Sequence, residues 1–109
     1  MLAKRSRLNL RAHPQFTKVF TLPYFVLRIT ENDHKDNRYG FLTSKKIDRR
    51  ATVRNRTKRV LRSCIEEMLE NIKTGYDMLF VLKKESVGVA KSNIASSIKT
   101  IFNKEGLIK

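Results

Sequence analysis

Residues 54–72 of this 109-residue chain have the sequence RNRTKRVLRSCIEEMLENI, and this stretch decides the fold. Its apolar residues recur at intervals of three and four, which is the period of an α-helix with one buried stripe. That stripe consists of Val60, Leu61, Cys64, Ile65, Met68, Leu69 and Ile72. The arginines come early, whereas the glutamates come late, which is the reverse of what the helix macrodipole favours. Helix stability therefore does not explain where the arginines stand.

Strand patterns flank this helix on both sides. Residues 24–30 alternate between two faces, with every second residue apolar, and residues 38–44 alternate in a similar way. Their close spacing predicts that these two segments pair as an antiparallel hairpin. Residues 76–82 form a largely apolar run, which predicts a buried strand.

A short helix is predicted near the start of the chain. Pro14 suits the first position of a helix, because its missing N–H has no helical partner there. Phe16, Val19 and Phe20 follow at helical spacing, and Pro23 prevents the helix from continuing.

A third helix is predicted to begin at about Lys91 and to end at Gly106, which suits a C-terminal cap. Its apolar positions are Ile94, Ile98, Ile101 and Phe102. The order is thus helix, strand, strand, helix, strand, helix. It predicts an α+β two-layer sandwich, in which a small central sheet is packed with three helices.

The composition excludes several classes of protein. Lys and Arg number 24 against 10 Asp and Glu, so the net charge is +14, and an excess of this size indicates an acidic partner. A single cysteine excludes an internal disulfide framework. The apolar runs are too short for a membrane-spanning helix, and the basic N-terminus lacks the apolar core of a secretion signal. We therefore expect a single cytoplasmic domain over residues 1–109 that binds nucleic acid, with residues 1–12 as a basic arm.

The positive charge is concentrated between residues 45 and 62, where nine basic residues accompany one acid, Asp48, for a net charge of +8. Arginine grips phosphate with two parallel hydrogen bonds and stacks on bases. A solvated basic helix face is the alternative interpretation, but so high a density with so little compensating acid favours nucleic-acid binding. The predicted contact residues are Lys45, Lys46, Arg49, Arg50, Arg54, Asn55, Arg56, Lys58, Arg59 and Arg62.

Six of the nine aromatic residues lie in the first predicted helix and the adjoining strands. Most of them are expected to belong to the core. The alternative is a groove between this helix and the sheet that stacks unpaired bases.

The chain resembles a known family at these positions. Ser44-Lys45-Lys46-Ile47, followed by residues 51–59 (ATVRNRTKR) and an amphipathic helix, is similar to the signature of the bacterial ribonuclease P protein subunit. Arg7-Leu8 and the Phe16-x-x-Val19-Phe20 pattern match the opening of the family, and the later strands and the last helix match its end. The resemblance covers nearly the whole chain.

This resemblance implies a fold with a left-handed βαβ crossover, of the ribonuclease P protein and ribosomal protein domain 2-like type. It also implies a function: the subunit binds a catalytic RNA, which uses Mg²⁺ to cut the 5′ leader from precursor tRNA. No catalytic residue, metal site or organic cofactor is then expected in this chain, which would act as a monomer within the ribonucleoprotein, away from membranes. The helix with Arg54, Asn55 and Arg56 would face the RNA. The implied leader-binding cleft comprises Arg11, Phe16, Lys18, Phe20, Phe25 and Arg28.

The sequence departs from the family in two places. Asp48-Arg49-Arg50 replaces a shorter linker that begins with Gly, and only residues 21–24 separate Phe20 from Phe25. The family's first strand is therefore expected to be missing or shortened.

Two other functions remain open. The first is a ribosomal or RNA-chaperone protein with no role in cleavage, which composition alone does not distinguish. The second is a stand-alone nuclease that uses Asp33, His34 and Asp36, although a polar loop is the simpler interpretation of these residues. Cys64 lies on the apolar stripe and is expected to pack in the core.

Overall fold

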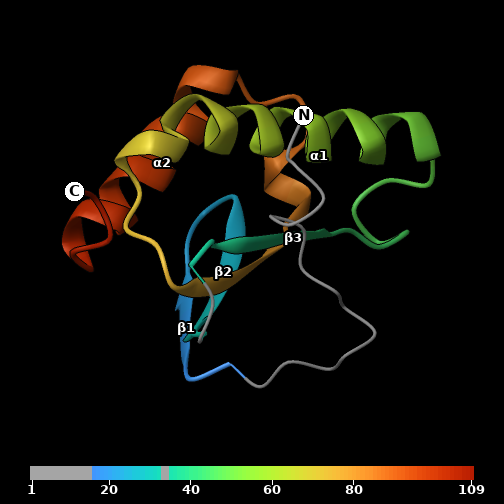
Figure 1. The fold of residues 1–109 in the computed structure, drawn as a ribbon. Coiled ribbons are helices and arrows are strands. Elements are labelled where there is room, and N and C mark those ends of the chain that lie inside the picture. The colour runs from blue at the N-terminus through green and yellow to red at the C-terminus, as the bar shows by residue number, and fades with distance from the viewer. Residues whose placement is uncertain (1–15, 33–34) are drawn as a thin grey trace.

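The computed structural model describes residues 16–32 and 35–109 of the chain. Its elements are β1 (Lys18–Thr21), β2 (Phe25–Glu31), β3 (Arg38–Leu42), α1 (Ala51–Met68), η3 (Leu69–Asn71), β4 (Tyr76–Leu82), η4 (Lys84–Ser86) and α2 (Lys91–Lys104). The four strands form one sheet in the order β1-β2-β4-β3. Both α-helices lie on the same side of this sheet (Figure 1). The predicted two-layer α+β architecture is therefore confirmed, with two of its three helices found among the described residues.

β4 lies between β2 and β3 in the sheet, and this makes the predicted hairpin wrong. β2 pairs with β4 in antiparallel register, Leu27 opposite Phe80, while β3 pairs with β4 in parallel register, Phe41 opposite Phe80. A polar network at the start of β4 joins its two neighbours. The buried Asp77 carboxylate accepts hydrogen bonds from Asn32 Nδ2 (2.8 Å), which follows β2, and from Arg38 Nε (2.7 Å) on β3.

The parallel pairing of β3 and β4 makes β3-α1-β4 a βαβ unit, as the family resemblance implies. Parallel neighbours need a long crossover, and α1 supplies it. The crossover carries the basic half of α1 across the helical face of the sheet, beside the exposed edge of β3 (Figure 1).

Residues 18–21 form an edge strand, so the helix predicted for residues 14–20 is wrong over its second half. Lys18 to Thr21 pair with Ile29 to Val26 of β2. The connection between the two strands is tight, because Leu22 N–H donates to the Phe25 carbonyl at 2.9 Å. With so few residues after Phe20, a helix there would leave the outer backbone groups of β2 without a partner strand. Residues 1–15, which include Pro14 and the predicted basic arm, lie outside the described residues.

The core lies between the sheet and the two helices. The Phe80 ring stacks on that of Phe41 at 5.4 Å and meets the Phe25 ring edge-on at 5.3 Å. Cys64 is fully buried, as the apolar stripe of α1 predicts. Phe25 of β2 and Phe80 of β4 are therefore core residues, as most of the aromatic residues were expected to be.

The observed bounds of the two helices agree with the predicted bounds for α2 but differ from them for α1. α1 begins at Ala51, three residues before the predicted start. α2 begins at Lys91 as predicted, and Gly106 adopts a left-handed backbone (φ +70°) just after its end. Gly106 N–H donates to Asn103 and Leu107 N–H donates to Phe102, which together form a Schellman cap.

Candidate nucleic-acid interface

Cationic side chains cover the first half of α1 and the loop before it. Within the part of the chain that the structure describes, seven of the ten predicted contact residues make no hydrogen bond, ion pair or cation–π contact through their side chains. We call these seven the basic surface: Lys45, Lys46, Arg49, Asn55, Arg56, Lys58 and Arg59. All but the half-buried Lys58 are exposed. The basic surface therefore presents cations that are free to meet an external anion.

The remaining three arginines have partners within the fold. Arg50 binds the Asp48 carboxylate with two parallel hydrogen bonds, of 3.1 Å from Nε and 3.0 Å from Nη2. Arg54 folds back toward the loop, and its Nη1 donates to the carbonyls of Asp48 and Arg49 at 2.9 Å each. Both side chains hold the loop against the start of α1.

Arg62 lies over the ring of Phe41, with 5.7 Å between its guanidinium carbon and the ring centroid. This is the distance of a cation–π contact. Because Phe41 also stacks on Phe80, the contact joins the outer face of α1 to the core through β3.

The ion pair with Arg50 changes the acidity of Asp48. The hydrogen bond from the Arg50 guanidinium, followed by that from the Arg50 backbone N–H, lowers the pKa of Asp48 from 3.8 to about 2. The carboxylate therefore stays charged at any physiological pH and keeps neutralising Arg50. Lys45, Lys46, Asp48 and Arg49 surround a shallow hollow of about 660 Å³ on the same loop.

The two ends of α1 differ in charge. Its first turn has no acidic residue and its last turn has no basic residue, so both ends oppose the macrodipole. At the C-terminal end, Glu67 accepts a 2.5 Å hydrogen bond from Lys91 at the start of α2. At the C-terminal end of α1, an ion pair between Glu67 and Lys91 therefore connects α1 to α2. At the N-terminal end, the positive charge faces outward.

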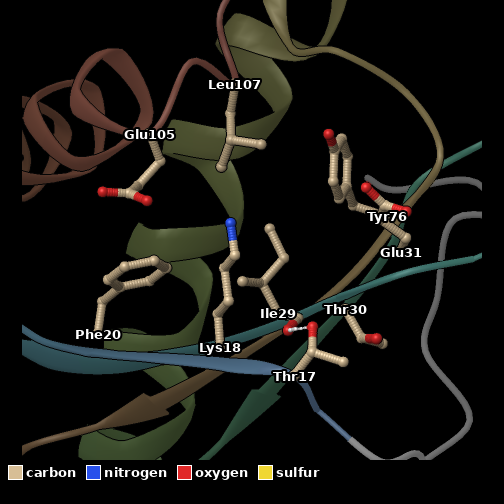
Figure 2. A pocket seen from close by; sticks show the side chains of 9 residues that line it. All are labelled: Thr17, Lys18, Phe20, Ile29, Thr30, Glu31, Tyr76, Glu105 and Leu107. Atoms are coloured by element: carbon tan, nitrogen blue, oxygen red, sulfur yellow. Dashed lines mark hydrogen bonds between the residues drawn. The ribbon is translucent and has the colours of Figure 1, made fainter.

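A second candidate site lies at the opposite edge of the sheet. A cavity of about 170 Å³ opens between β1 and the end of α2, and its lining includes Lys18, Phe20, Glu31, Tyr76 and Glu105. Figure 2 shows the Lys18 side chain extending into this cavity, with Glu105 on one side and Glu31 on the other. Two carboxylates beside one ammonium group give this cavity little attraction for a phosphate.

Comparison with known proteins agrees with this geometry. The family model of ribonuclease P matches residues 4–106. A ribonuclease P protein component from Alkaliphilus oremlandii is 32% identical over 106 residues, which cover 92% of each chain. The chain belongs to the ribonuclease P protein family. Another relative in this family, from Clostridium kluyveri, is 33% identical over 94 residues, which cover 84% of this chain and 83% of the relative.

Solved structures of the family share the fold. A Staphylococcus aureus RNase P protein mutant with defective mRNA degradation activity superposes with a TM-score of 0.80 at 19% identity, covering 95% of this chain and 91% of the other. The RNase P protein from Thermotoga maritima gives a TM-score of 0.79 at 22% identity, covering 90% of this chain and 96% of the other.

Membership of the ribonuclease P family gives the chain its function. It is the protein component of a ribonucleoprotein enzyme that processes tRNA, and this implies association with the RNA of that enzyme. The ribosomal or chaperone alternative is not favoured.

Among the helices of the described residues, none has the length and apolar character needed to span a membrane.

The predicted leader-binding residues do not form one cleft in this family member. Phe25 is fully buried in the core, so its predicted contact with the leader is wrong. Lys18 and Phe20 line the cavity beside β1, on the helical side of the sheet. Arg28 is exposed and alternates with the core residues of β2, so it lies on the opposite face of the sheet. Phe16 is half-buried just before β1, and Arg11 lies outside the described residues.

Several contacts in the structure were not predicted from the sequence. The pairing of Arg50 with Asp48 could have been suspected from their spacing of two residues, since a loop brings such neighbours together. The Arg62–Phe41 contact and the Asn32–Asp77 bond join residues far apart in the chain, and only the sheet order reveals them. His13 and the Asp33–His34 pair of the nuclease hypothesis lie outside the described residues.

Proposed function

We propose that this chain binds the catalytic RNA of ribonuclease P through the basic surface on α1 and the preceding loop. The observation that carries this proposal is the set of cations that have no carboxylate partner within the described residues. Unpaired cations attract phosphate strongly, because binding releases the counterions that surround the RNA.

Within the basic surface, Arg56 and Arg59 are the strongest candidates for direct phosphate contacts. Both are exposed and stand about one helical turn apart on α1. Their guanidinium groups can each give two parallel hydrogen bonds to one phosphate. Lys45 and Lys46 add mobile point charges from the loop, and Asn55 offers a donor and an acceptor for sugar or base edges.

We assign the 5′ leader of precursor tRNA to the face of the sheet that bears Arg28. Arg28 is exposed there and pairs across the sheet with Val19, which is 58% exposed. Sites that bind single strands have positively charged grooves that follow the backbone, and Arg28 supplies a positive charge on this face. The cavity around Lys18 suits the leader less, because Glu31 and Glu105 repel phosphate.

We assign the Mg²⁺ ions of the reaction to the RNA partner. Among the described residues, no three His, Cys, Asp or Glu side chains gather in a group that could hold a metal ion. The role of this chain is then to neutralise phosphates and position the RNA and its substrate, as a single copy in the ribonucleoprotein.

Reconstitution tests this proposal. The chain is added to the catalytic RNA at low Mg²⁺ concentration, and removal of the 5′ leader from precursor tRNA is followed over time. We expect strong stimulation by the native chain, much less by Arg56→Ala/Arg59→Ala, and none from the protein without RNA. The matched control is Lys99→Ala/Lys104→Ala, which removes two exposed cations from α2. Equal stimulation by the two variants would contradict the assignment of the RNA to α1.

A further inference from the structure

A second pocket lies beside the basic surface, between α1 and the segment that leads into α2. Its volume is about 240 Å³, below the range of about 300–1,000 Å³ that drug-sized ligands occupy. It therefore suits a single small ring system. The lining residues are Arg56, Thr57, Val60, Leu61, Ser86, Gly88, Val89 and Ile94.

The interior of this pocket is largely apolar, and its two hydroxyl groups donate hydrogen bonds to backbone carbonyls. Thr57 Oγ1 donates to the Val53 carbonyl at 2.9 Å, and Ser86 Oγ donates to the Lys83 carbonyl at 2.6 Å. Both hydroxyl protons are therefore in use, while the oxygen lone pairs can still accept a hydrogen bond. Val60 and Val89 contribute aliphatic surface from opposite walls. Such a pocket favours a flat, largely apolar group with a donor on its edge.

Arg56 supplies the charge at this pocket. Its side chain is exposed and makes no hydrogen bond or ion pair within the described part of the chain. A guanidinium beside an apolar pocket can stack on a ring or bind the phosphate attached to it. Gly88 in the opposite wall has a left-handed backbone (φ +74°), and a Cβ there would meet no atom within 4 Å. That wall is therefore low and leaves room for a group to enter.

We infer that this pocket receives one unstacked nucleobase of the bound RNA, while Arg56 holds the phosphate of the same nucleotide. The inference rests on the proposed function, because the basic surface brings the RNA to α1. It adds a buried base to a surface whose other proposed contacts are mainly with phosphates.

Methyl NMR of the full chain tests the occupant. Adenosine 5′-monophosphate and ribose 5-phosphate are titrated separately, and the methyl resonances of Val60, Leu61, Val89 and Ile94 are followed. We expect the nucleotide to shift these methyl groups saturably and ribose 5-phosphate to leave them unchanged, because only the nucleotide carries a base. An equal response to both, or no response to either, would overturn the inference.

A substitution that fills the pocket tests its role in the complex. Val60→Phe occupies the space without changing charge, so the base can no longer enter the pocket, and we expect affinity for the catalytic RNA to fall about tenfold. The salt dependence of binding should stay unchanged, since no phosphate contact is lost. Val53→Phe, on the same helix but outside the pocket, is the matched control and should bind as the native chain does.

The outcomes separate this inference from the proposed function. If Val60→Phe is folded by circular dichroism and binds the RNA like the native chain, the base pocket is wrong while RNA binding by the basic surface stands. If Arg56→Ala/Arg59→Ala also binds like the native chain, the proposed function fails as well. Val89→Phe, which fills the pocket from its opposite wall, gives the same test should Val60→Phe not fold.

Discussion

The basic surface and the cavity beside β1 were both expected to contact RNA, and the structure separates them. The basic surface presents cations that lack carboxylate partners within the described residues. The cavity holds Lys18 together with Glu31 and Glu105. Charge density along one helix can be seen in a sequence, because neighbouring residues share the surface. Which charges share a cavity depends on strand pairing and on where a distant helix ends. Here the cavity that was expected to bind the leader contains two carboxylates beside Lys18.

The largest effect should follow from removing charge at the basic surface. We expect Arg56→Ala/Arg59→Ala to weaken binding of the catalytic RNA roughly 100-fold or more, because each charge-assisted hydrogen bond contributes about 1.5–3 kcal/mol. Filter binding at fixed salt measures this affinity. Lys18→Ala, at the cavity, should change it little. Comparable losses in both proteins would remove the distinction between the two regions.

The next largest effect concerns Phe20, which is half-buried and packs against the core. Complete removal of a buried phenylalanine costs about 3–5 kcal/mol, so for this partly buried ring we expect Phe20→Ala to lower the free energy of unfolding by about 2 kcal/mol. Urea denaturation measures this change. A ring that instead stacks on the leader from an exposed helix would give little loss of stability and a clear loss of leader affinity.

A smaller effect should separate the two faces of the sheet. The reconstituted enzyme should prefer precursor tRNA over mature tRNA, and we expect Arg28→Ala to reduce this preference roughly tenfold. The substitution removes one cation that contacts the leader. Lys18→Ala removes a cation from the other face and should leave this preference unchanged. The ratio of the two dissociation constants is the measurement. The opposite ranking of the two variants would assign the leader to the cavity.

The smallest effect concerns Asp48, whose pKa is lowered to about 2 by Arg50. Since the folded pKa lies below the ordinary value, the ion pair stabilises the fold fully above pH 4 and loses this effect as the pH falls toward 2. Carboxyl NMR titration should give a midpoint near 2 in the native chain, and Arg50→Ala should return it toward 3.8. A native midpoint at the ordinary value would mean that Arg50 is free and belongs to the basic surface.

Those parts of the fold that depend on local pattern could be predicted from the sequence. The strand Tyr76–Leu82 matches its expected bounds, because a short apolar run between turns is typical of a buried strand. The start of α2 at Lys91 also matches. The hairpin was wrong because β4 lies between β2 and β3, and the alternation of residues in a strand does not indicate which strand is its neighbour.

The segment that contains Phe16, Val19 and Phe20 shows a limit of periodicity. Apolar residues at this spacing fit one face of a helix, yet Lys18–Thr21 pairs with β2 as an edge strand, because a short connection brings it alongside β2. The candidate site was predictable to a similar degree. Its positive charge was evident from the sequence. The hydrogen bonds of Arg50 and Arg54 and the cation–π contact of Arg62 depend on how the loop and the sheet fold, so they were not predicted.

The salt dependence of RNA binding tests the central claim most directly. Affinity of the native chain for the catalytic RNA is measured over a range of salt concentrations and compared with Lys45→Ala/Arg56→Ala/Arg59→Ala and with Lys99→Ala/Lys104→Ala/Lys109→Ala. Each lost phosphate contact reduces the steepness of the negative slope of log K against log salt by about 0.7–0.9, so the slope of the first variant should become shallower by about 2–3 while that of the second stays native. Equal slopes in the two variants would contradict the claim that the cations of α1 and its loop hold the RNA.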